Sequence, residues 1–124
     1  VRSLMDSVGR TILIDEDYFP VFQALASCSP AWYFQIVDSF ARAGLKYGLS
    51  KDSAVEIAAQ AMAGAATLLL AEREAGTIPA QLIDRVTSPG GTTIAGLLAA
   101  EEGGLSNALV GAVDASIHAD SHLG

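Results

Sequence analysis

Apolar residues recur at the spacing of an α-helix through most of the chain, and short runs of Gly, Pro and Ser separate the helical segments. From residue 30 to 47, apolar side chains stand at i, i+4, i+8 and i+11, which is the spacing of one helix face. That face consists of Trp32, Ile36, Phe40 and Ala43. Ser29 followed by Pro30 is a favourable helix start, because Pro at the first helical position sacrifices no hydrogen bond. The pattern therefore predicts a helix over residues 30–47.

The next segment, from Ser50 to Glu74, is apolar almost all the way round. Ser50 is the expected N-cap, and the only charged residue between Ala54 and Ala71 is Glu56. A helix of this kind must be covered on most of its sides. A small domain has few other elements that could cover the helix, so a second chain is expected to cover part of it. We therefore predict an obligate, largely helical oligomer; a central helix in a monomeric bundle is the alternative.

The same segment is long enough to be weighed as a membrane span. Glu56 and Gln60 near its start, its many alanines and the lack of any other membrane feature speak against that interpretation. We expect no membrane partner.

Shorter helical patterns occupy the rest of the chain. The expected helices cover Ser3–Gly9, a brief segment capped by Asp17, Ala80–Val86, Thr93–Glu102 and a last segment capped by Ser106. Residues 11–14 form the only β-leaning run, which is too short to found a sheet. With no internal repeat or linker, the sequence predicts an all-α fold in which residues 1–124 form a single helical domain.

The segment Val86–Thr93, Val-Thr-Ser-Pro-Gly-Gly-Thr-Thr, concentrates turn-forming residues between two predicted helices. Pro89 has a fixed φ and no backbone N–H. Gly90 and Gly91 permit positive φ and the close approach of a ligand to the backbone. The pattern predicts a tight turn at this point.

A helix is expected to begin near Ile94, capped by Thr92 or Thr93. The free N–H groups of such a helix start, together with the helix dipole, favour an anion such as a carboxylate or a phosphate. An ordinary Pro-Gly turn with a helix cap is the alternative. The segment is neither a Walker loop, since no Lys follows the glycines, nor a dinucleotide fingerprint, since no third glycine has the required spacing.

Charge and cysteine content narrow the choice of partners. The chain has 7 basic and 14 acidic residues, a net charge of −7, which argues against nucleic acid because phosphate binding needs a basic patch. The single cysteine, Cys28, excludes an internal disulfide and fits the reducing cytoplasm. No signal peptide is visible, and the opening on Val1 suggests a processed or excised piece.

The cysteine and the two histidines are further candidates for a chemical role. Cys28 is interpreted as a small residue at a helix start rather than a nucleophile, because no histidine has positional support as its base. His118 and His122 stand at i and i+4, a spacing compatible with a metal, but a polar tail near the terminus is the better interpretation. We expect no metal.

The run from Ser88 to Thr93 carries a family resemblance, supported by Leu97, Gly103-Gly104 and Ala112–Ser116. With the earlier Ser29-Pro30-Ala31 and Gln60–Ala66 segments, the chain resembles the C-terminal domain of pyrroline-5-carboxylate reductase over nearly all of its length. The resemblance implies an NAD(P)H-dependent reductase of proline biosynthesis. It implies a helical domain that interlocks with a second subunit, in dimers that often assemble into decamers. Nothing in the sequence resembles the family's N-terminal Rossmann half, which carries NADPH or NADH.

The resemblance also assigns roles to residues of the turn. It places the carboxylate of a small cyclic imino acid on backbone N–H groups of Gly91, Thr92 and Thr93, with Val86 and Ser88 beside the pocket. Thr93 matches the residue whose hydroxyl group hydrogen-bonds the ring nitrogen, and is the candidate catalytic residue. Because the cofactor delivers hydride to the C=N carbon, no protein nucleophile is required. This chain alone is expected to be inactive.

One segment departs from the family pattern. The family usually shows Gly-Ser-Gly-Pro-Ala-Tyr where this chain has residues 27–32, Ser-Cys-Ser-Pro-Ala-Trp. The added side chains would narrow the site. This departure leaves two alternatives open: a reductase of a related cyclic imino acid, and a helical dimerisation module without this activity. A reductase similar to 6-phosphogluconate dehydrogenase is a third alternative, which shares the helical dimer but accounts less well for the Pro-Gly-Gly turn.

Overall fold

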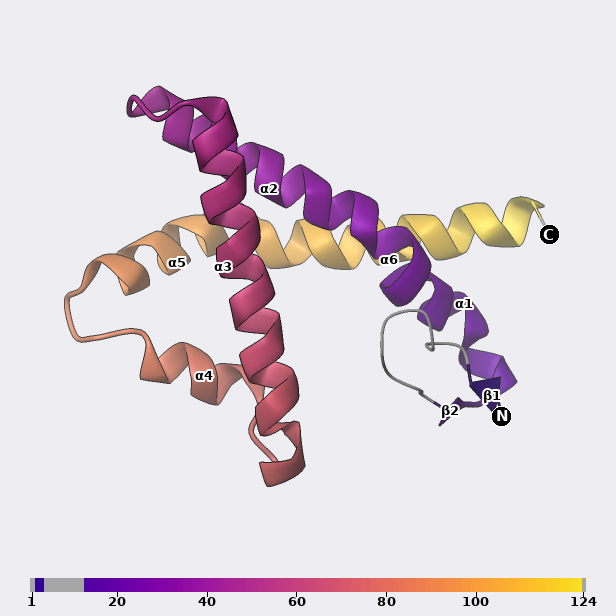
Figure 1. Cartoon of the computed structure of the whole chain (residues 1–124). Helices are drawn as coiled ribbons and strands as arrows, with labels where there is room; N and C mark the ends of the chain where they lie inside the picture. The colour runs from indigo at the N-terminus through magenta and orange to yellow at the C-terminus, as the bar shows by residue number, and fades with distance from the viewer. Residues whose placement is uncertain (1, 4–12, 124) are drawn as a thin grey trace. The chain divides into compact units, whose positions relative to one another are not determined.

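The computed structural model describes residues 2–3 and 13–123, and almost all of them are helical (Figure 1). This confirms the predicted all-α class. The contacts divide the chain into two compact units, Val1–Phe34 with Ser106–Gly124, and Gln35–Leu105. The single domain over residues 1–124 stays a prediction.

The first unit contains the N-terminal elements, the start of α2 and nearly all of the last helix. Its elements are β1 (Arg2–Ser3), β2 (Leu13–Ile14), the 3₁₀ turn η2 (Glu16–Tyr18), α1 (Phe19–Gln23), the π-helical turn η3 (Ala24–Cys28), α2 (Ser29–Lys46, continuing into the second unit) and α6 (Leu105–Leu123). β1 and β2 pair antiparallel over only two residues each. The predicted helix Ser3–Gly9 is wrong at Ser3, which lies in β1; residues 4–9, like 11 and 12 of the β-leaning run, lie outside the described residues.

Two predicted caps differ from the structure. Asp15 rather than Asp17 caps η2, because the Asp17 N–H donates to the Asp15 side chain at 3.3 Å. The carboxylate thus serves the N–H two residues later, where a free donor of the first turn lies. At the other end of the unit α6 begins at Leu105, so Ser106 lies within the helix instead of preceding it.

The predicted helix start at Ser29-Pro30 is also wrong, because the helix runs on from α1 through η3 into α2. The Ser29 N–H donates to the Ala24 carbonyl, five residues back, which is the wider π register. Pro30 has no N–H to donate, so in this register the Leu25 carbonyl loses its backbone donor. The Ser29 hydroxyl group donates to that carbonyl instead, and Ser29 is buried. The π turn and the serine together let a proline stand inside a continuous helix.

The second unit contains the rest of α2 and three further helices. These are α3 (Lys51–Glu72), which ends in the 3₁₀ turn η4 (Arg73–Ala75), then α4 (Pro79–Arg85) and α5 (Thr92–Glu102). Ser50 caps α3 as predicted, because its hydroxyl oxygen accepts from the Ser53 N–H at 3.1 Å. Asp38 of α2 lies between Arg42 at 3.2 Å and Lys51 at 3.0 Å, which ties α2 to the first residue of α3.

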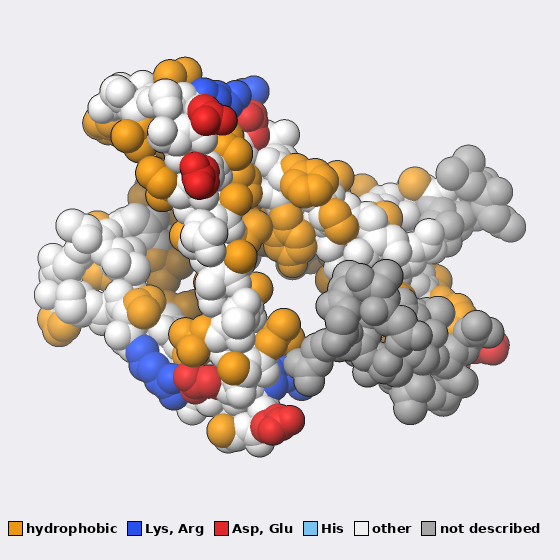
Figure 2. Space-filling model, in the orientation of Figure 1, with side chains coloured by type: hydrophobic (Ala, Val, Ile, Leu, Met, Phe, Trp, Pro, Cys, Tyr) orange, Lys and Arg blue, Asp and Glu red, His pale blue; other side chains and the backbone are white. Residues whose placement is uncertain are grey.

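Small side chains bring α2 and α3 together and leave their large apolar side chains uncovered. The buried hydrophobic residues among those described are Ala24, Ala41 and Ala54. Phe40, expected on the inward face of α2, is 63% exposed, and Ile57 of α3 is 58% exposed. Figure 2 shows hydrophobic side chains spread over the visible surface. Exposed apolar area of this extent marks an interaction surface.

A hollow of about 490 Å³ lies between α2 and α3. Its lining is almost wholly apolar and consists of Phe40, Gly44, Leu49, Ala54, Ile57, Ala58, Ala61, Met62 and Ala65. The apolar side chains of α3 are thus largely uncovered within one chain, which agrees with the expectation that a second chain covers part of this helix.

One helical segment of the described chain, Lys51–Ala75, is long and apolar enough to cross a membrane by length and composition. A helix in the core of a soluble protein can be equally long and apolar, so length and composition alone do not assign a membrane span.

Candidate functional site

The connection from α4 to α5 forms a tight turn over Ser88–Gly91. The Gly91 N–H donates to the Ser88 carbonyl at 3.0 Å, and Gly90 has φ of 69°. Pro89 in second place and a positive-φ glycine in third place are the arrangement of a type II β-turn. The predicted turn is present, and Gly90 is the residue that needs the left-handed conformation.

Gly91 is constrained by space rather than by its backbone conformation. Its φ of −82° is open to any residue, but a Cβ at this position would overlap the Ser88 hydroxyl oxygen and lie 3.2 Å from the Ser88 carbonyl oxygen. Gly91 is also the N-cap of α5, without a side-chain hydrogen bond. The predicted capping by Thr92 or Thr93 is therefore wrong, because the extended backbone of Gly91 lets the helix begin at Thr92, two residues before Ile94.

The start of α5 presents unsatisfied backbone donors. The first hydrogen bond into the helix runs from the Ala95 N–H to the Gly91 carbonyl at 3.4 Å. Within the described part of the chain, the N–H groups of Thr92, Thr93 and Ile94 have no backbone acceptor. These donors lie at the positive end of the helix dipole, the arrangement that favours an anion.

The structure brings the five predicted site residues onto one short segment, since Val86, Ser88, Gly91, Thr92 and Thr93 all border the turn. All except Gly91 are exposed, and Val86 is 64% exposed. The apolar hollow of α2 and α3, and a smaller one of about 350 Å³ beside η4, are lined by other residues. The segment therefore offers donors and hydroxyl groups, while the walls of a closed pocket have to come from other residues.

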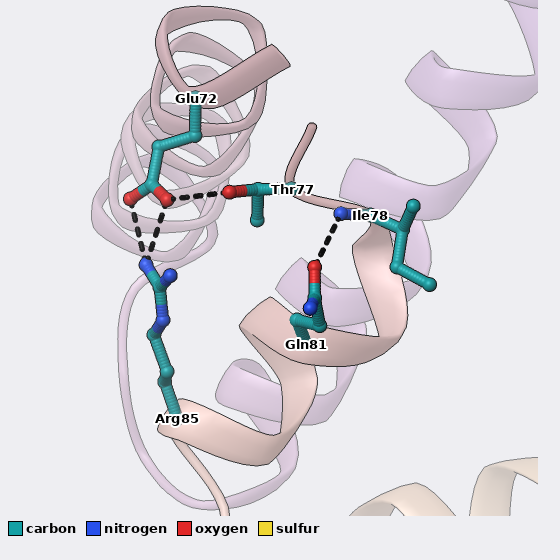
Figure 3. A network of polar contacts seen from close by, with 5 residues as sticks. All are labelled: Glu72, Thr77, Ile78, Gln81 and Arg85. Atoms are coloured by element: carbon teal, nitrogen blue, oxygen red, sulfur yellow. Dashed lines mark hydrogen bonds and ion pairs between the residues drawn. The ribbon is translucent and has the colours of Figure 1, made fainter. Parts of the chain in front are cut away.

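A polar network beside this segment was missed by the sequence analysis (Figure 3). Nη1 of Arg85 donates to both carboxylate oxygens of Glu72, at 2.8 and 2.7 Å, and the Thr77 hydroxyl group donates to one of them at 3.1 Å. The Ile78 N–H donates to the Gln81 side chain at 2.9 Å. Glu72 and Arg85 belong to different helices, so no helical spacing connects them. One part of the network did have a sequence signal. Gln81 stands three residues after Ile78, the spacing at which a Gln side chain caps the start of a helix.

Two carboxyl groups have lowered pKa values. Hydrogen bonds from Arg85 and then Thr77 lower the pKa of Glu72 below its ordinary value. A hydrogen bond from Lys51 is the main cause of the lowered pKa of Asp38; desolvation opposes it, and the charges of Lys51 and Arg42 lower the pKa further. Both groups are therefore ionised at neutral pH and serve as structural partners of cations.

The described residues contain no group of three or more His, Cys, Asp or Glu side chains that could hold a metal ion. His118 lies in α6, and the side chain of His122 lies outside the described residues. Cys28 is partly buried in η3, within a helix rather than at its start.

Comparison with known proteins identifies the family. Residues 16–123 match the family model described as pyrroline-5-carboxylate reductase dimerisation. The pyrroline-5-carboxylate reductase of Treponema pallidum is 40% identical over 115 residues, which are 93% of this chain and 43% of that protein. Pyrroline-5-carboxylate reductase 2 of Homo sapiens is 40% identical over 116 residues, 94% of this chain and 35% of that protein.

Solved structures agree with this assignment. The 1-pyrroline-5-carboxylate reductase of Streptococcus pyogenes has a TM-score of 0.81 and 39% identity, covering 91% of this chain and 42% of that one. The Plasmodium falciparum pyrroline carboxylate reductase, solved with NADP bound, has a TM-score of 0.80 and 27% identity, covering 90% and 41%. The chain thus spans less than half the length of these relatives. It belongs to the pyrroline-5-carboxylate reductase dimerisation family.

Proposed function

We propose that this chain is the dimerisation and substrate-binding part of an NAD(P)H-dependent reductase that converts 1-pyrroline-5-carboxylate to proline. The observation that carries the proposal is the start of α5, where the Ser88–Gly91 turn leaves three N–H groups without a backbone acceptor in the described chain. A helix N-terminus of this kind accepts a carboxylate without a bulky cation. The relatives named for this reaction share the family of the chain.

In this proposal the turn holds the substrate and Thr93 orients its ring. The backbone N–H groups around Gly91, Thr92 and Thr93 bind the carboxylate, and the Thr93 hydroxyl group hydrogen-bonds the ring nitrogen. Val86 and Ser88 border the ring. NADPH or NADH, when bound, would supply hydride to the C=N carbon, while the ring nitrogen takes up a proton from solvent, so that the imine becomes an amine. The protein contributes position, because holding the imine at a fixed distance and angle removes much of the entropic barrier.

We assign the cofactor to a separate domain. The sequence of this chain contains no dinucleotide fingerprint, and a related structure was solved with NADP bound. Either NADPH or NADH fits this proposal, and the chain alone is expected to be inactive.

We also propose that two copies of the chain interlock through α2 and α3 and that such dimers assemble into a decamer. The exposed apolar side chains of these helices and the family's dimerisation role support the homodimer. A net charge of −7 argues against nucleic acid as a partner, and no membrane partner is invoked, because a second subunit suffices to cover α3. A cytoplasmic location accords with the single Cys28.

The altered segment before Pro30 favours one second candidate, a reductase of a related cyclic imino acid. Ser27 and Ser29 are bulkier than the glycines that the family usually has at these two positions. However, the Ser29 hydroxyl group is engaged with the Leu25 carbonyl, so one of the added groups serves the helix backbone. This observation leaves pyrroline-5-carboxylate as the first substrate to test.

The test is turnover of 1-pyrroline-5-carboxylate by the full-length protein, with NADPH and NADH compared. Thr93→Val removes the hydroxyl group at nearly constant volume and should lower kcat/KM by about 10- to 100-fold, the loss expected for a hydrogen bond to a group that becomes charged. Thr93→Ser keeps the hydroxyl group and should retain most of the activity. Unchanged kinetics in Thr93→Val would contradict the role of Thr93. A folded, dimeric protein without turnover would contradict the substrate, and other cyclic imines would be tested next.

A further inference from the structure

We infer that the Arg85–Glu72 ion pair is a brace that positions the carboxylate-binding turn, which makes Arg85 a positioning residue for substrate binding. This inference rests on the proposed function of the turn. Arg85 is the last residue of α4, directly before Val86, and Glu72 is the last residue of α3. The pair thus joins the end of one helix to the end of the other.

The Glu72 carboxylate receives three hydrogen bonds from the segment that follows it. Two come from Nη1 of Arg85, at 2.8 and 2.7 Å, and one comes from the Thr77 hydroxyl group at 3.1 Å. The Thr77 N–H donates at 3.3 Å to the Glu72 backbone carbonyl as well. One carboxylate therefore holds both the loop between the helices and the far end of α4, as the close-up shows (Figure 3).

Only Val86 and Thr87 separate Arg85 from the turn. The Val86 N–H donates to the Ile83 carbonyl at 3.1 Å, and the Thr87 hydroxyl group donates to the same carbonyl at 2.9 Å. The next bond closes the turn, from the Gly91 N–H to the Ser88 carbonyl at 3.0 Å. Val86 and Thr87 are bonded to the last turn of α4, and Ser88 follows Thr87 directly, so the chain leads from the end of α4 into the turn without a free segment between them.

A polar brace is needed because α4 has little else to hold it in the chain. It is seven residues long, and a helix of this length is not stable by itself in water. Ile83 and Val86 are exposed, so apolar packing within the chain fixes this end of α4 weakly. The Arg85 side chain is 55% exposed and Glu72 26% exposed, and pairs in such surroundings contribute little to folding. Variants of the pair should therefore fold.

The experiment measures substrate binding and local order in the full-length protein. Arg85→Met should raise KM for 1-pyrroline-5-carboxylate by about fivefold, the equilibrium equivalent of losing one exposed ion pair, and leave KM for the nicotinamide cofactor unchanged. Arg85→Lys keeps a charge within reach of Glu72 and should recover part of the loss. Glu72→Gln should act like Arg85→Met, and the double variant should be no worse than either single variant, because both changes remove the same interaction.

Hydrogen–deuterium exchange supplies a measurement that does not depend on turnover. Arg85→Met should increase exchange in residues 86–95 and leave the centre of α3 unchanged. Arg42→Met is the matched control: it removes an arginine paired with a carboxylate, Asp38, at 3.2 Å, but that pair lies near the start of α3 and has no link to the turn. The control should change neither KM nor exchange in residues 86–95.

The outcomes separate this inference from the proposed function. If the wild-type protein turns over and Arg85→Met has wild-type KM and exchange, the brace is wrong and the proposed function stands. An equal rise of KM in Arg42→Met would also overturn the brace, because it would reveal a general effect of charge. A wild-type protein without turnover contradicts the proposed function, and exchange at residues 86–95 then decides whether Arg85 orders the turn.

Discussion

Gly44 of α2 lies so close to Ala54 of α3 that a Cβ placed on Gly44 would be 2.9 Å from the Ala54 Cβ. A real Cβ does not approach another atom this closely, so the two helices meet at a point where only a glycine fits. Ala54 is itself 5% exposed. This close contact of α2 and α3 is thus made by two small residues, which also line the hollow together with larger ones such as Phe40 and Met62.

The first prediction concerns this contact. Gly44→Ala should destabilise the folded protein by about 1–3 kcal/mol, because the added methyl group overpacks a close helix contact. Gly96→Ala in α5 is the matched control, since a Cβ there meets nothing within 4 Å in the chain. It should be neutral or stabilising by up to about 1 kcal/mol, because alanine is the better helix former. Denaturant unfolding at fixed protein concentration measures both, and equal effects would contradict the close contact.

A second prediction concerns the exposed apolar surface of α2 and α3. Light scattering should show that the chain is at least a dimer. Ile57→Lys should weaken that dimer strongly, because an unpaired charge would be buried at the subunit interface. Gln60→Lys places the same charge on the same helix, at a position that is already polar, and should weaken the dimer less. A stable monomer in the wild-type chain would rule out our interpretation of α3.

Gly91 supports a third prediction. Gly91→Ala should raise KM for the imino acid and lower the stability by about 1 kcal/mol, because the new methyl group overlaps the Ser88 side chain. Ser88→Ala in the same protein should restore part of the stability, since the overlapping hydroxyl oxygen is then gone. Thermal unfolding of the single and double variants tests this. Additive losses would show that Ser88 and Gly91 do not interact in this way.

The fourth prediction is a pH dependence of stability. Because the folded protein lowers the pKa values of Glu72 and Asp38, the unfolded chain binds protons first as the pH falls. The contribution of both carboxylates is fully present above their ordinary pKa values, about 4, and is lost as the pH falls through the lowered values. Unfolding from pH 7 to pH 3 should therefore show a decline that is shallower in Glu72→Gln. An identical slope in the variant would refute the coupling of Glu72 to Arg85.

Local signals in the sequence predicted much of the fold. Ser50 was identified as the cap of α3 because a cap needs only a hydroxyl group beside the first free N–H groups. The turn before α5 follows from the sequence because Pro89 fixes its own φ and Gly90 can adopt the positive φ that the third position of the turn requires. Errors arose where the alternatives differ by a residue or two, as with Gly91 replacing Thr92 or Thr93 as the N-cap. Capping rules rank such neighbours closely, and the surrounding backbone decides between them.

The sequence by itself determined the helices, the turn before α5 and the apolar surface of α3 that a partner has to bury. It could do so because periodicity, turn residues and hydrophobicity act over a few neighbouring positions. Only the tertiary structure showed that Arg85 meets Glu72, that Pro30 stands within a π-widened helix, and that Phe40 is exposed while Ala41 is buried. Each of these depends on where the path of the backbone places groups from different turns or different helices. The spacing of residues along the chain does not give the distance between side chains on different helices. These contacts therefore appear only when the elements are placed in three dimensions.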